Sequence, residues 1–229
     1  MRRSINKEAL VVSGNPTSRV SEAYRLLRTK IHFSPKDAAH QVIMVTSTRS
    51  SEGKTTTVSN LAVTYAMEGR KVLLIDADMR KPALHDIYSL SNGYGLSTVL
   101  AGDVLVQKAI QETGINHLSL LTAGPVPANP AELMDSAAMQ DMLVQLRQEY
   151  DVILIDTPPV LAVSDGVITS ALCDGVIMVV AAGKIKRSHL RAAKEQLDHV
   201  KANMLGLVLN RSGRDQQAFA ADHYGMQAQ

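Results

Sequence analysis

The residues best suited to chemistry stand at the end of a short apolar run, in the segment QVIMVTSTRSSEGKTTT at 41–57. A strand that leads through a loop into a helix gathers backbone N–H groups around one concavity, and an anion is favoured there. Gly53 would let the backbone close on phosphates, Lys54 would neutralise the β- and γ-phosphates, and the Thr55 hydroxyl would reach a bridging Mg²⁺ ion. The segment therefore predicts a phosphate-binding loop.

The match to the phosphate-loop pattern is incomplete. The pattern G-x-x-x-x-G-K-[ST] requires glycine where this chain has Thr48, and the tripeptide G-K-T alone also fits a helix start capped by serine or threonine. Two further buried-strand runs favour the phosphate loop. They read KVLLIDAD at 71–78 and YDVILIDTPP at 150–159, and both carry an acidic residue where the apolar run ends. Three strands that each end in residues suited to binding phosphate or a metal ion are rarely found together by chance.

Acidic residues at the strand ends are candidates for metal binding and proton transfer. Asp76 and Asp78 are alternate residues, so both can face one crevice, with one near a metal ion and the other near an incoming hydroxyl. The alternative is that one of them only caps the helix that begins near Pro82. Asp156 matches the strand-end acid that orients Mg²⁺ through water in phosphate-loop enzymes.

The alternation of apolar runs with helical stretches predicts a doubly wound α/β fold with a mostly parallel sheet. A strand–helix–strand succession demands a right-handed crossover, and helices then cover both faces of the sheet. The ligand should lie beyond the carboxyl ends of the strands, where the loop at 47–54, Asp76 and Asp156 converge. The expected strands are 42–45, 72–75, 117–121, 152–155, 175–180 and 204–209, and the main expected helices are 18–33, 54–68, 137–149 and 188–200.

Composition excludes several classes of protein. At 229 residues the chain suits one α/β domain or two small ones, and a net charge of +2 with 3% aromatic residues argues against nucleic acid as a partner. Cys173 is the only cysteine, so no internal disulfide can form, and its place before the run GVIMVV favours a buried thiol in a reducing cytoplasm. No apolar run approaches the roughly 18 residues of a membrane span. Any link to a membrane is therefore expected to come through a partner.

The chain divides into three parts by composition. Residues 1–17 are polar and irregular and end in the turn Gly14–Thr17, so they are expected to form a flexible arm. Residues 18–212 hold the predicted domain, and residues 213–229 form a C-terminal tail.

The first predicted helix of the domain, 18–33, has an apolar stripe on one side and charges on the other. Glu22, Arg25 and Arg28 share one arc of roughly 120° that points outward. By itself this pattern indicates a solvated face with an i,i+3 ion pair. The opposite, apolar stripe consists of Val20, Tyr24, Leu27 and Ile31.

Taken together, these motifs resemble the bacterial protein-tyrosine kinases that regulate capsule and exopolysaccharide synthesis, known as BY-kinases. The resemblance covers nearly the whole chain. It rests on SSEGKT at 50–55, LLIDADMRKP at 73–82, ILIDTPP at 153–159, NPAEL at 129–133, and EAYRLLR at 22–28, which matches the pattern E-x-x-R-x-x-R. It implies a P-loop NTPase of the deviant Walker type, whose nucleotide-binding loop here comprises Ser50, Ser51, Glu52, Gly53, Lys54, Thr55 and Thr56.

The resemblance also implies roles for the strand-end residues. The activity would be ATP-dependent phosphorylation of tyrosines, often in the tail of a neighbouring copy within a ring, and later of other proteins. Asp76 would assist the attacking tyrosine hydroxyl, while Asp78 and Asp156 would position Mg²⁺ and Lys54 would hold the phosphates.

The same resemblance implies two kinds of protein partner. The helix motif formed by Glu22, Arg25 and Arg28 would lie at a subunit interface of the ring rather than on a solvated face. Short members of the family are activated by a separate transmembrane adaptor. The chain would then be cytoplasmic and recruited to the inner face of the cell membrane through that adaptor.

The chain departs from the family pattern at two places. Ser50 and Ser51 stand where many members have Pro-Gly, so the loop is expected to tolerate a positive φ only with some strain. Members usually end in a cluster of tyrosines, whereas Tyr224 is the only tyrosine after position 210. Tyr224 is therefore either the phosphoacceptor or simply an exposed residue.

Two smaller sites also allow two interpretations. Asn210 follows the last strand, where it would either offer an amide to the adenine or form a turn. A basic turn precedes and begins the last helix, where the helix dipole disfavours positive charge. It is either solvated or a docking point for an acidic partner or a phosphate, and it consists of Lys184, Lys186, Arg187 and Arg191.

Two other functions fit parts of the sequence. One is a partitioning or septum-placing ATPase, which shares the fold without phosphorylating protein. Those ATPases carry a lysine early in the phosphate loop, where this chain has Arg49, and the membrane-placing ones end in an amphipathic helix, for which residues 216–229 lack an apolar stripe. The other is a nucleotide-binding scaffold that has lost catalysis, which the tyrosine-poor tail allows.

Overall fold

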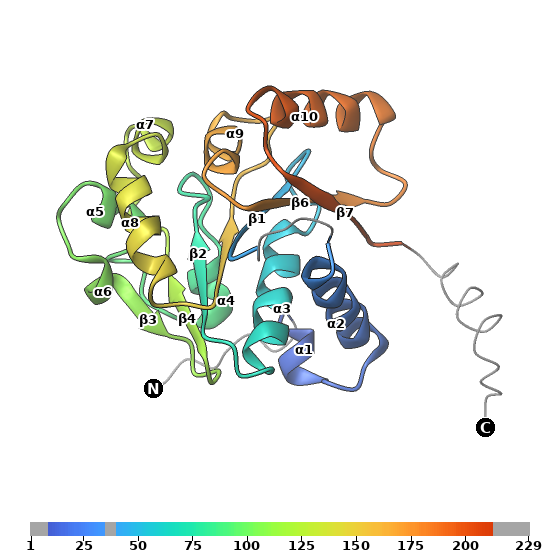
Figure 1. Cartoon of the computed structure of the whole chain (residues 1–229), viewed down its shortest axis with the longest axis horizontal. Helices are drawn as coiled ribbons and strands as arrows, with labels where there is room; N and C mark the ends of the chain where they lie inside the picture. The colour runs from blue at the N-terminus through green and yellow to red at the C-terminus, as the bar shows by residue number, and fades with distance from the viewer. Residues whose placement is uncertain (1–8, 35–39, 213–229) are drawn as a thin grey trace.

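The fold is built on one seven-stranded sheet. The computed structural model describes residues 9–34 and 40–212 (Figure 1). The strand order is β3-β4-β2-β5-β1-β6-β7, and every neighbouring pair is parallel except β3 with β4. The strands are β1 Val42–Ser47, β2 Val72–Asp76, β3 Ile110–Glu112, β4 Leu118–Leu121, β5 Val152–Asp156, β6 Gly175–Ala181 and β7 Met204–Asn210.

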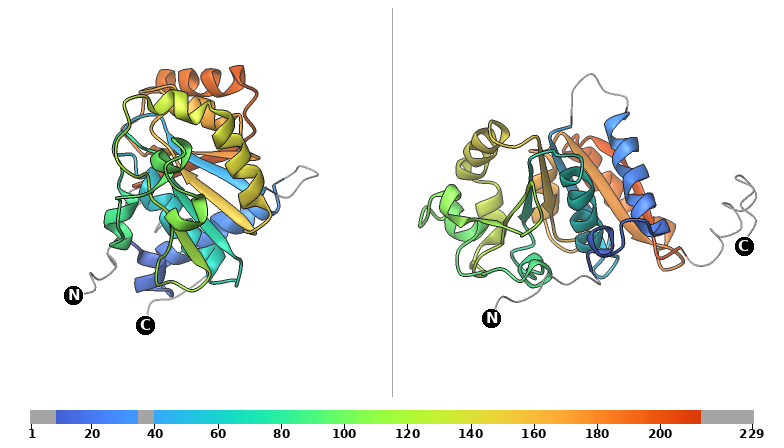
Figure 2. Two further views of the ribbon diagram at one scale, coloured as in Figure 1. Left: turned by 90° about the vertical axis from the view of Figure 1, so that its left-hand side faces the viewer. Right: turned by 90° about the horizontal axis from the view of Figure 1, so that it is seen from below.

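Helices cover both faces of this sheet, as the views of Figures 1 and 2 show. One face packs against α1–α4, with α3 at the centre. The other packs against α5–α8 and, farther along the sheet, α9 and α10. The helices are α1 Val11–Gly14, α2 Arg19–His32, α3 Lys54–Ala66, α4 Leu84–Tyr88, α5 Leu96–Leu100, α6 Val106–Ala109, α7 Pro130–Met134, α8 Ala137–Arg147, α9 Asp165–Ser170 and α10 Arg187–His199. The predicted doubly wound arrangement is therefore confirmed.

The central strands are continuous apolar runs because both of their faces are buried. Every residue of β1, β2, β5 and β6 is buried. Successive side chains alternate between the two cores: Ile43 and Val45 join the α3 side, while Val42 joins the α8 side. Such strands have no polar face, which explains why the runs in the sequence lack the alternation of a half-exposed strand.

The strand register brings the acidic strand ends level with one another. Asp156 of β5 is paired with Asp76 of β2 on one side and with Val45 of β1 on the other. The loop that follows β1 and the acids that end β2 and β5 therefore meet at one edge of the sheet. This confirms the convergence that the sequence predicts.

The expected strands and main helices are found with ends that differ by at most two residues. Of the short elements, only the helix expected near Pro82 was predicted, and it is α4. The edge strand β3, which pairs antiparallel with β4, and the short helices α1, α5, α6, α7 and α9 were not. Among the described residues, no helix is long and apolar enough to cross a lipid bilayer.

The described part of the predicted flexible arm, from Ala9 on, is a packed segment, which corrects that expectation locally. Leu10 and Val12 are fully buried against the α3 side of the core. The buried Asn60 of α3 accepts a hydrogen bond from the Val12 N–H (3.0 Å) and donates one to the Ala9 carbonyl (2.8 Å). The short run Ala9–Val12 was the apolar signal for this contact. The division into arm, domain and tail stays a prediction.

The apolar stripe of α2 is narrower than predicted. Tyr24, Leu27 and Ile31 pack against the core around α3, but Val20 is half exposed. The first turn of α2 thus lies beyond the core surface against which the rest of the helix packs, so the buried stripe begins at Tyr24.

Truncation of Leu10 tests the packing of the N-terminal segment. We expect Leu10→Ala to lower the free energy of unfolding by about 2–5 kcal/mol, because it opens a cavity in the core. The matched substitution Val20→Ala, at a half-exposed site, should change it by less than about 0.5 kcal/mol. Urea unfolding followed by circular dichroism gives both values, and equal small effects would show that residues 9–14 do not pack as described.

Candidate functional site

The loop between β1 and α3 is closed by a buried glutamate. The carboxylate of Glu52 accepts hydrogen bonds from the Thr48 hydroxyl (2.9 Å) and from the Arg49 N–H (2.8 Å). The Ser47 hydroxyl donates to the Arg49 carbonyl (2.7 Å). Thr48, which stands where the phosphate-loop pattern wants glycine, therefore holds the loop together. Glu52 is one of the predicted loop residues, but its role in closing the loop depends on contacts that form only in the folded loop.

Asn210 lies directly against the loop from the far end of β7. Its side-chain amide donates to the Glu52 carbonyl (2.9 Å). A Cβ atom added to Gly53 would lie 2.0 Å from the Asn210 Nδ2 atom, so any side chain here would displace the Asn210 amide. Gly53 also has a φ of 93°, in the left-handed region that favours glycine. Asn210 is thus part of the loop's wall, and its contact with adenine stays a prediction.

Ser51 adopts the backbone conformation that its side chain disfavours. Its φ is 65°, in the left-handed region. This is the strain expected where many relatives have Pro-Gly. The loop keeps its shape because Glu52 and Asn210 hold the residues on either side of the strained position.

Lys54 joins acids from two neighbouring strand ends. Its ammonium lies 2.9 Å from the Asp78 carboxylate and 3.4 Å from the Asp156 carboxylate, and its side chain is 11% exposed. The Thr55 hydroxyl donates to the second Asp156 oxygen (2.7 Å). The structure thus brings together four of the predicted site residues, from the ends of β2 and β5 and the start of α3.

The charges of this cluster stabilise one another. Burial opposes the charged form of Lys54, but Asp156 and Asp78 more than offset it, and the pKa of Lys54 is raised. Burial raises the pKa of Asp156, while Lys54 and the Thr55 hydrogen bond act in the opposite direction. The attraction between Lys54 and the acids thus offsets part of the cost of burying these groups.

Asp76 has a different environment from Asp78. One carboxylate oxygen accepts from the N–H groups of Ala83 (3.1 Å) and Leu84 (3.0 Å), and the other from the Asp78 N–H (3.2 Å). The helix-capping alternative is therefore realised at the start of α4, in a side chain that still lies beside the cluster. Burial, with a contribution from Asp156, raises the pKa of Asp76 to about 7. A carboxyl with that pKa can accept a proton at neutral pH.

The donor set fits a magnesium nucleotide. Mg²⁺ prefers hard oxygen ligands and usually takes only one or two carboxylates, with substrate phosphates and water completing the octahedron. Thr55, Asp78 and Asp156 supply such oxygens within one cluster. Among the described residues, no group of three or more His, Cys, Asp or Glu side chains could hold a metal ion unaided. A divalent ion here would therefore share the phosphates of its nucleotide.

The charged motif of α2 is only partly exposed. Glu22 and Arg25 form the expected i,i+3 ion pair (2.9 Å). The predicted outward orientation of Arg28 is wrong: its guanidinium donates to the Thr64 carbonyl of α3 (3.0 Å) and pairs with Glu68 (2.6 Å). Arg28 points inward because the end of α3 offers it both a free carbonyl and a carboxylate.

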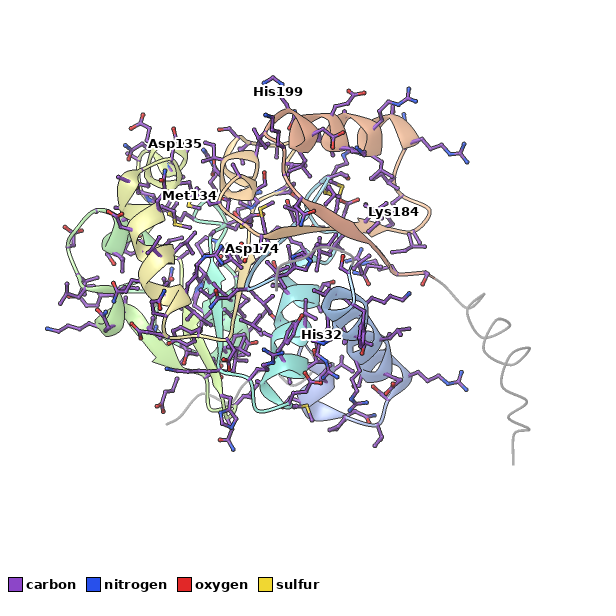
Figure 3. The ribbon with its side chains drawn as sticks, viewed as in Figure 1. His32, Met134, Asp135, Asp174, Lys184 and His199 are labelled. Carbon is purple, nitrogen blue, oxygen red and sulfur yellow. The ribbon has the colours of Figure 1, made fainter. Side chains whose placement is uncertain are left out.

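The remaining predicted sites are less defined by the structure. Tyr224 lies outside the described residues. Lys184 lies in the connection from β6 to α10, and His199 ends that helix (Figure 3). None of the four basic side chains at 184–191 forms an ion pair with another described residue. Cys173 is partly buried, its thiol donates to the Thr169 carbonyl (3.2 Å), and burial raises its pKa, so it is no ready nucleophile.

Comparison with known proteins adds a family context. Residues 40–204 match the family model described as an AAA domain. The chain is 41% identical to the tyrosine-protein kinase YwqD of Bacillus subtilis over 209 residues, which cover 91% of this chain and 88% of that protein. These matches support the predicted nucleotide-binding fold.

Solved structures give the same picture. The kinase domain of the Escherichia coli tyrosine kinase ETK superposes with a TM-score of 0.86 at 34% identity, covering 92% of this chain and 82% of the other. The chimerical protein CapA2B2 also gives a TM-score of 0.86, at 40% identity over 92% and 93% of the two chains. The predicted P-loop type of doubly wound fold is thereby confirmed.

Glycine at position 51 should stabilise the protein. We expect Ser51→Gly to raise the free energy of unfolding by about 1 kcal/mol, because it removes the left-handed strain of a non-glycine residue. Ser50→Gly is the matched control, since Ser50 has no positive φ, and it should lower stability by a few tenths of a kcal/mol. Urea unfolding distinguishes them, and a loss of stability in both variants would contradict the strain.

The buried Asp76 should make stability depend on pH. Its folded pKa of about 7 lies above the ordinary value, so the folded state binds more protons between about pH 4 and 7, and stability falls as pH rises through that window. We expect the free energy of unfolding of the wild type to fall, by at most about 3 kcal/mol, relative to that of Asp76→Asn between pH 5 and pH 8. Parallel pH profiles of the two proteins would show that Asp76 is not perturbed.

Proposed function

This chain belongs to the bacterial tyrosine-protein kinases, and from that premise we propose that it uses Mg²⁺ and ATP to phosphorylate its own tyrosines and those of other proteins in the control of capsule or exopolysaccharide synthesis. The kinase activity follows from the family. The cofactors, the residue roles, the assembly and the cellular process are proposals. The observation that supports the cofactors and the residue roles is the contact of Lys54 with two strand-end acids, one of which also accepts a hydrogen bond from the Thr55 hydroxyl.

The nucleotide would be held mainly by the loop backbone. Residues 50–56 pass from the strained Ser51 through Gly53 to the start of α3, whose first N–H groups would bind the phosphates. When the nucleotide binds, the Lys54 ammonium would move from the two carboxylates to the β- and γ-phosphates. Asn210 ends β7, donates a hydrogen bond to the Glu52 carbonyl beside Gly53, and would contact the base.

The acids would divide the work of phosphoryl transfer. When bound, Mg²⁺ would neutralise the phosphate charge, and Thr55, Asp78 and Asp156 are the side chains that would hold it. Asp76 is the only one of the three acids whose hydrogen bonds all come from backbone N–H groups of its own loop, and its raised pKa suits proton transfer from an incoming tyrosine hydroxyl. Positioning and charge neutralisation would supply most of the rate enhancement.

Copies of the chain would associate in a ring through α2. Glu22 is largely exposed and Arg25 is partly exposed, so this ion pair is open to a neighbouring copy, whereas Arg28 fastens α2 to α3. Tyr224 would be the phosphoacceptor offered to the next copy. A transmembrane adaptor would recruit and activate the kinase at the inner face of the membrane, in keeping with the likeness to a chimerical protein named CapA2B2.

The alternative of a partitioning or septum-placing ATPase is not favoured, because the relatives reported above are named tyrosine-protein kinases. A scaffold without catalysis would have to keep Lys54, Asp78 and Asp156 in mutual contact without using them.

Labelled ATP tests the proposal. Purified full-length protein is incubated with Mg²⁺ and γ-labelled ATP, with and without the cytoplasmic segment of an adaptor, beside Lys54→Met, Asp76→Asn and Tyr224→Phe. We expect label on tyrosine in the wild type, a loss of at least about 100-fold in the first two variants, and loss of self-labelling but not of substrate labelling in the third. Release of free phosphate without labelled protein would identify an ATPase, and bound nucleotide with neither product a scaffold.

A further inference from the structure

A bidentate ion pair links the loop that carries Asp78 to helix α9. Arg80 stands two residues after Asp78, in the connection between β2 and α4. Its Nε donates to one Asp165 oxygen (2.8 Å) and its Nη2 to the other (3.1 Å). Asp165 is the first residue of α9 and its side chain is 1% exposed, whereas that of Arg80 is 41% exposed. The fork geometry fixes direction as well as distance.

On one side, the pair acts on the turn that aims Asp78. One Asp78 oxygen accepts from the Lys81 N–H (3.1 Å), and the other contacts Lys54 (2.9 Å). Arg80 therefore lies inside the turn that the Asp78 carboxylate closes. A displacement of Arg80 would move that turn, and with it the oxygen that faces Lys54.

On the other side, Asp165 belongs to a segment that other hydrogen bonds fix to β1, and this segment with β1 forms a frame for the site. The segment from Asp156 to α9 is fastened to β1, because the Thr46 hydroxyl donates to the Pro158 carbonyl (3.0 Å) and the Val160 N–H to the Ser47 carbonyl (3.0 Å). The start of α9 is thus fixed relative to β1, which leads into the phosphate loop. Arg80 connects the Asp78 turn to this frame.

We propose that Arg80 and Asp165 are positioning residues for phosphoryl transfer, which hold the Asp78 turn at the distance from Asp156 that a magnesium nucleotide requires. The inference rests on the proposed function of the Lys54 cluster. The alternative is a purely structural role, in which Asp165 stabilises the start of α9 and Arg80 only compensates its buried charge. Loss of Arg80 would then lower stability without changing Mg²⁺-dependent binding.

The exposed arginine offers a clean test, because its removal opens no cavity. The variants are Arg80→Gln, Arg80→Lys, Asp165→Asn and the double variant Arg80→Gln with Asp165→Asn, and Lys81→Gln is the matched control at a neighbouring exposed cation. Calorimetry measures ADP affinity with Mg²⁺ and with EDTA, single-turnover labelling measures phosphoryl transfer, and urea unfolding measures stability.

We expect Arg80→Gln to weaken Mg²⁺-dependent ADP binding and to slow transfer, each by about 10- to 100-fold, with ADP affinity in EDTA unchanged. Arg80→Lys should restore little, since an ammonium cannot form the fork. The double variant should be no worse than Arg80→Gln, and Lys81→Gln should resemble the wild type.

Two results would overturn the proposal. One is a loss of stability in Arg80→Gln with normal Mg²⁺-dependent binding and transfer, which would make the pair only structural. The other is an equal loss of ADP affinity with and without Mg²⁺. If Asp165→Asn fails to fold, the Arg80 variants still decide. If the wild type transfers no phosphate to tyrosine, the proposed function fails, while the calorimetric comparison still decides the role of the pair.

Discussion

The structure depends on one buried ammonium that neutralises acids from neighbouring strands. Asp78 follows β2, Asp156 ends β5, and Lys54 begins the helix that follows β1, so the cluster unites three adjacent strands of the sheet. Buried carboxylates without a partner would be strongly unfavourable, and so would a buried ammonium. The level strand ends and the start of α3 are thus held together by the same groups that the chemistry needs.

The phosphate loop is shaped before any ligand arrives. Glu52 holds its start through Thr48 and Arg49, and the Asn210 amide occupies the place that a Cβ atom at position 53 would take. These contacts retain a strained serine at position 51. A loop that its own side chains already hold in shape requires little reorganisation when an anion binds, and such preorganisation is a common source of electrostatic catalysis.

Most of this site could be predicted from the sequence because each part combines a continuous apolar run with a residue at its end that can bind phosphate or a metal ion. These runs form the neighbouring parallel strands Val42–Ser47, Val72–Asp76 and Val152–Asp156, and parallel strands have their carboxyl ends at the same edge of the sheet. The family motifs assigned roles to acids that the strand-end pattern alone leaves equivalent.

Other features could not be predicted because they depend on contacts between distant segments. Four apolar residues at 9–12 carry no periodicity, and only the surface of α3 shows that Leu10 is a core residue. Helical spacing places Arg28 with Glu22, but the carbonyl of Thr64 draws it inward. The partners of Glu52 and of Asp165 are likewise decided by the folded loops.

The most direct measurement is a crystal structure of the full chain with Mg²⁺ and a non-hydrolysable ATP analogue. The account predicts that the Lys54 ammonium lies on the β- and γ-phosphates, with the Thr55 hydroxyl and the Asp156 carboxylate on the ion and Asp78 beside it. A nucleotide bound at another edge of the sheet, or one held at this loop while Lys54 stays on the two acids, would contradict it.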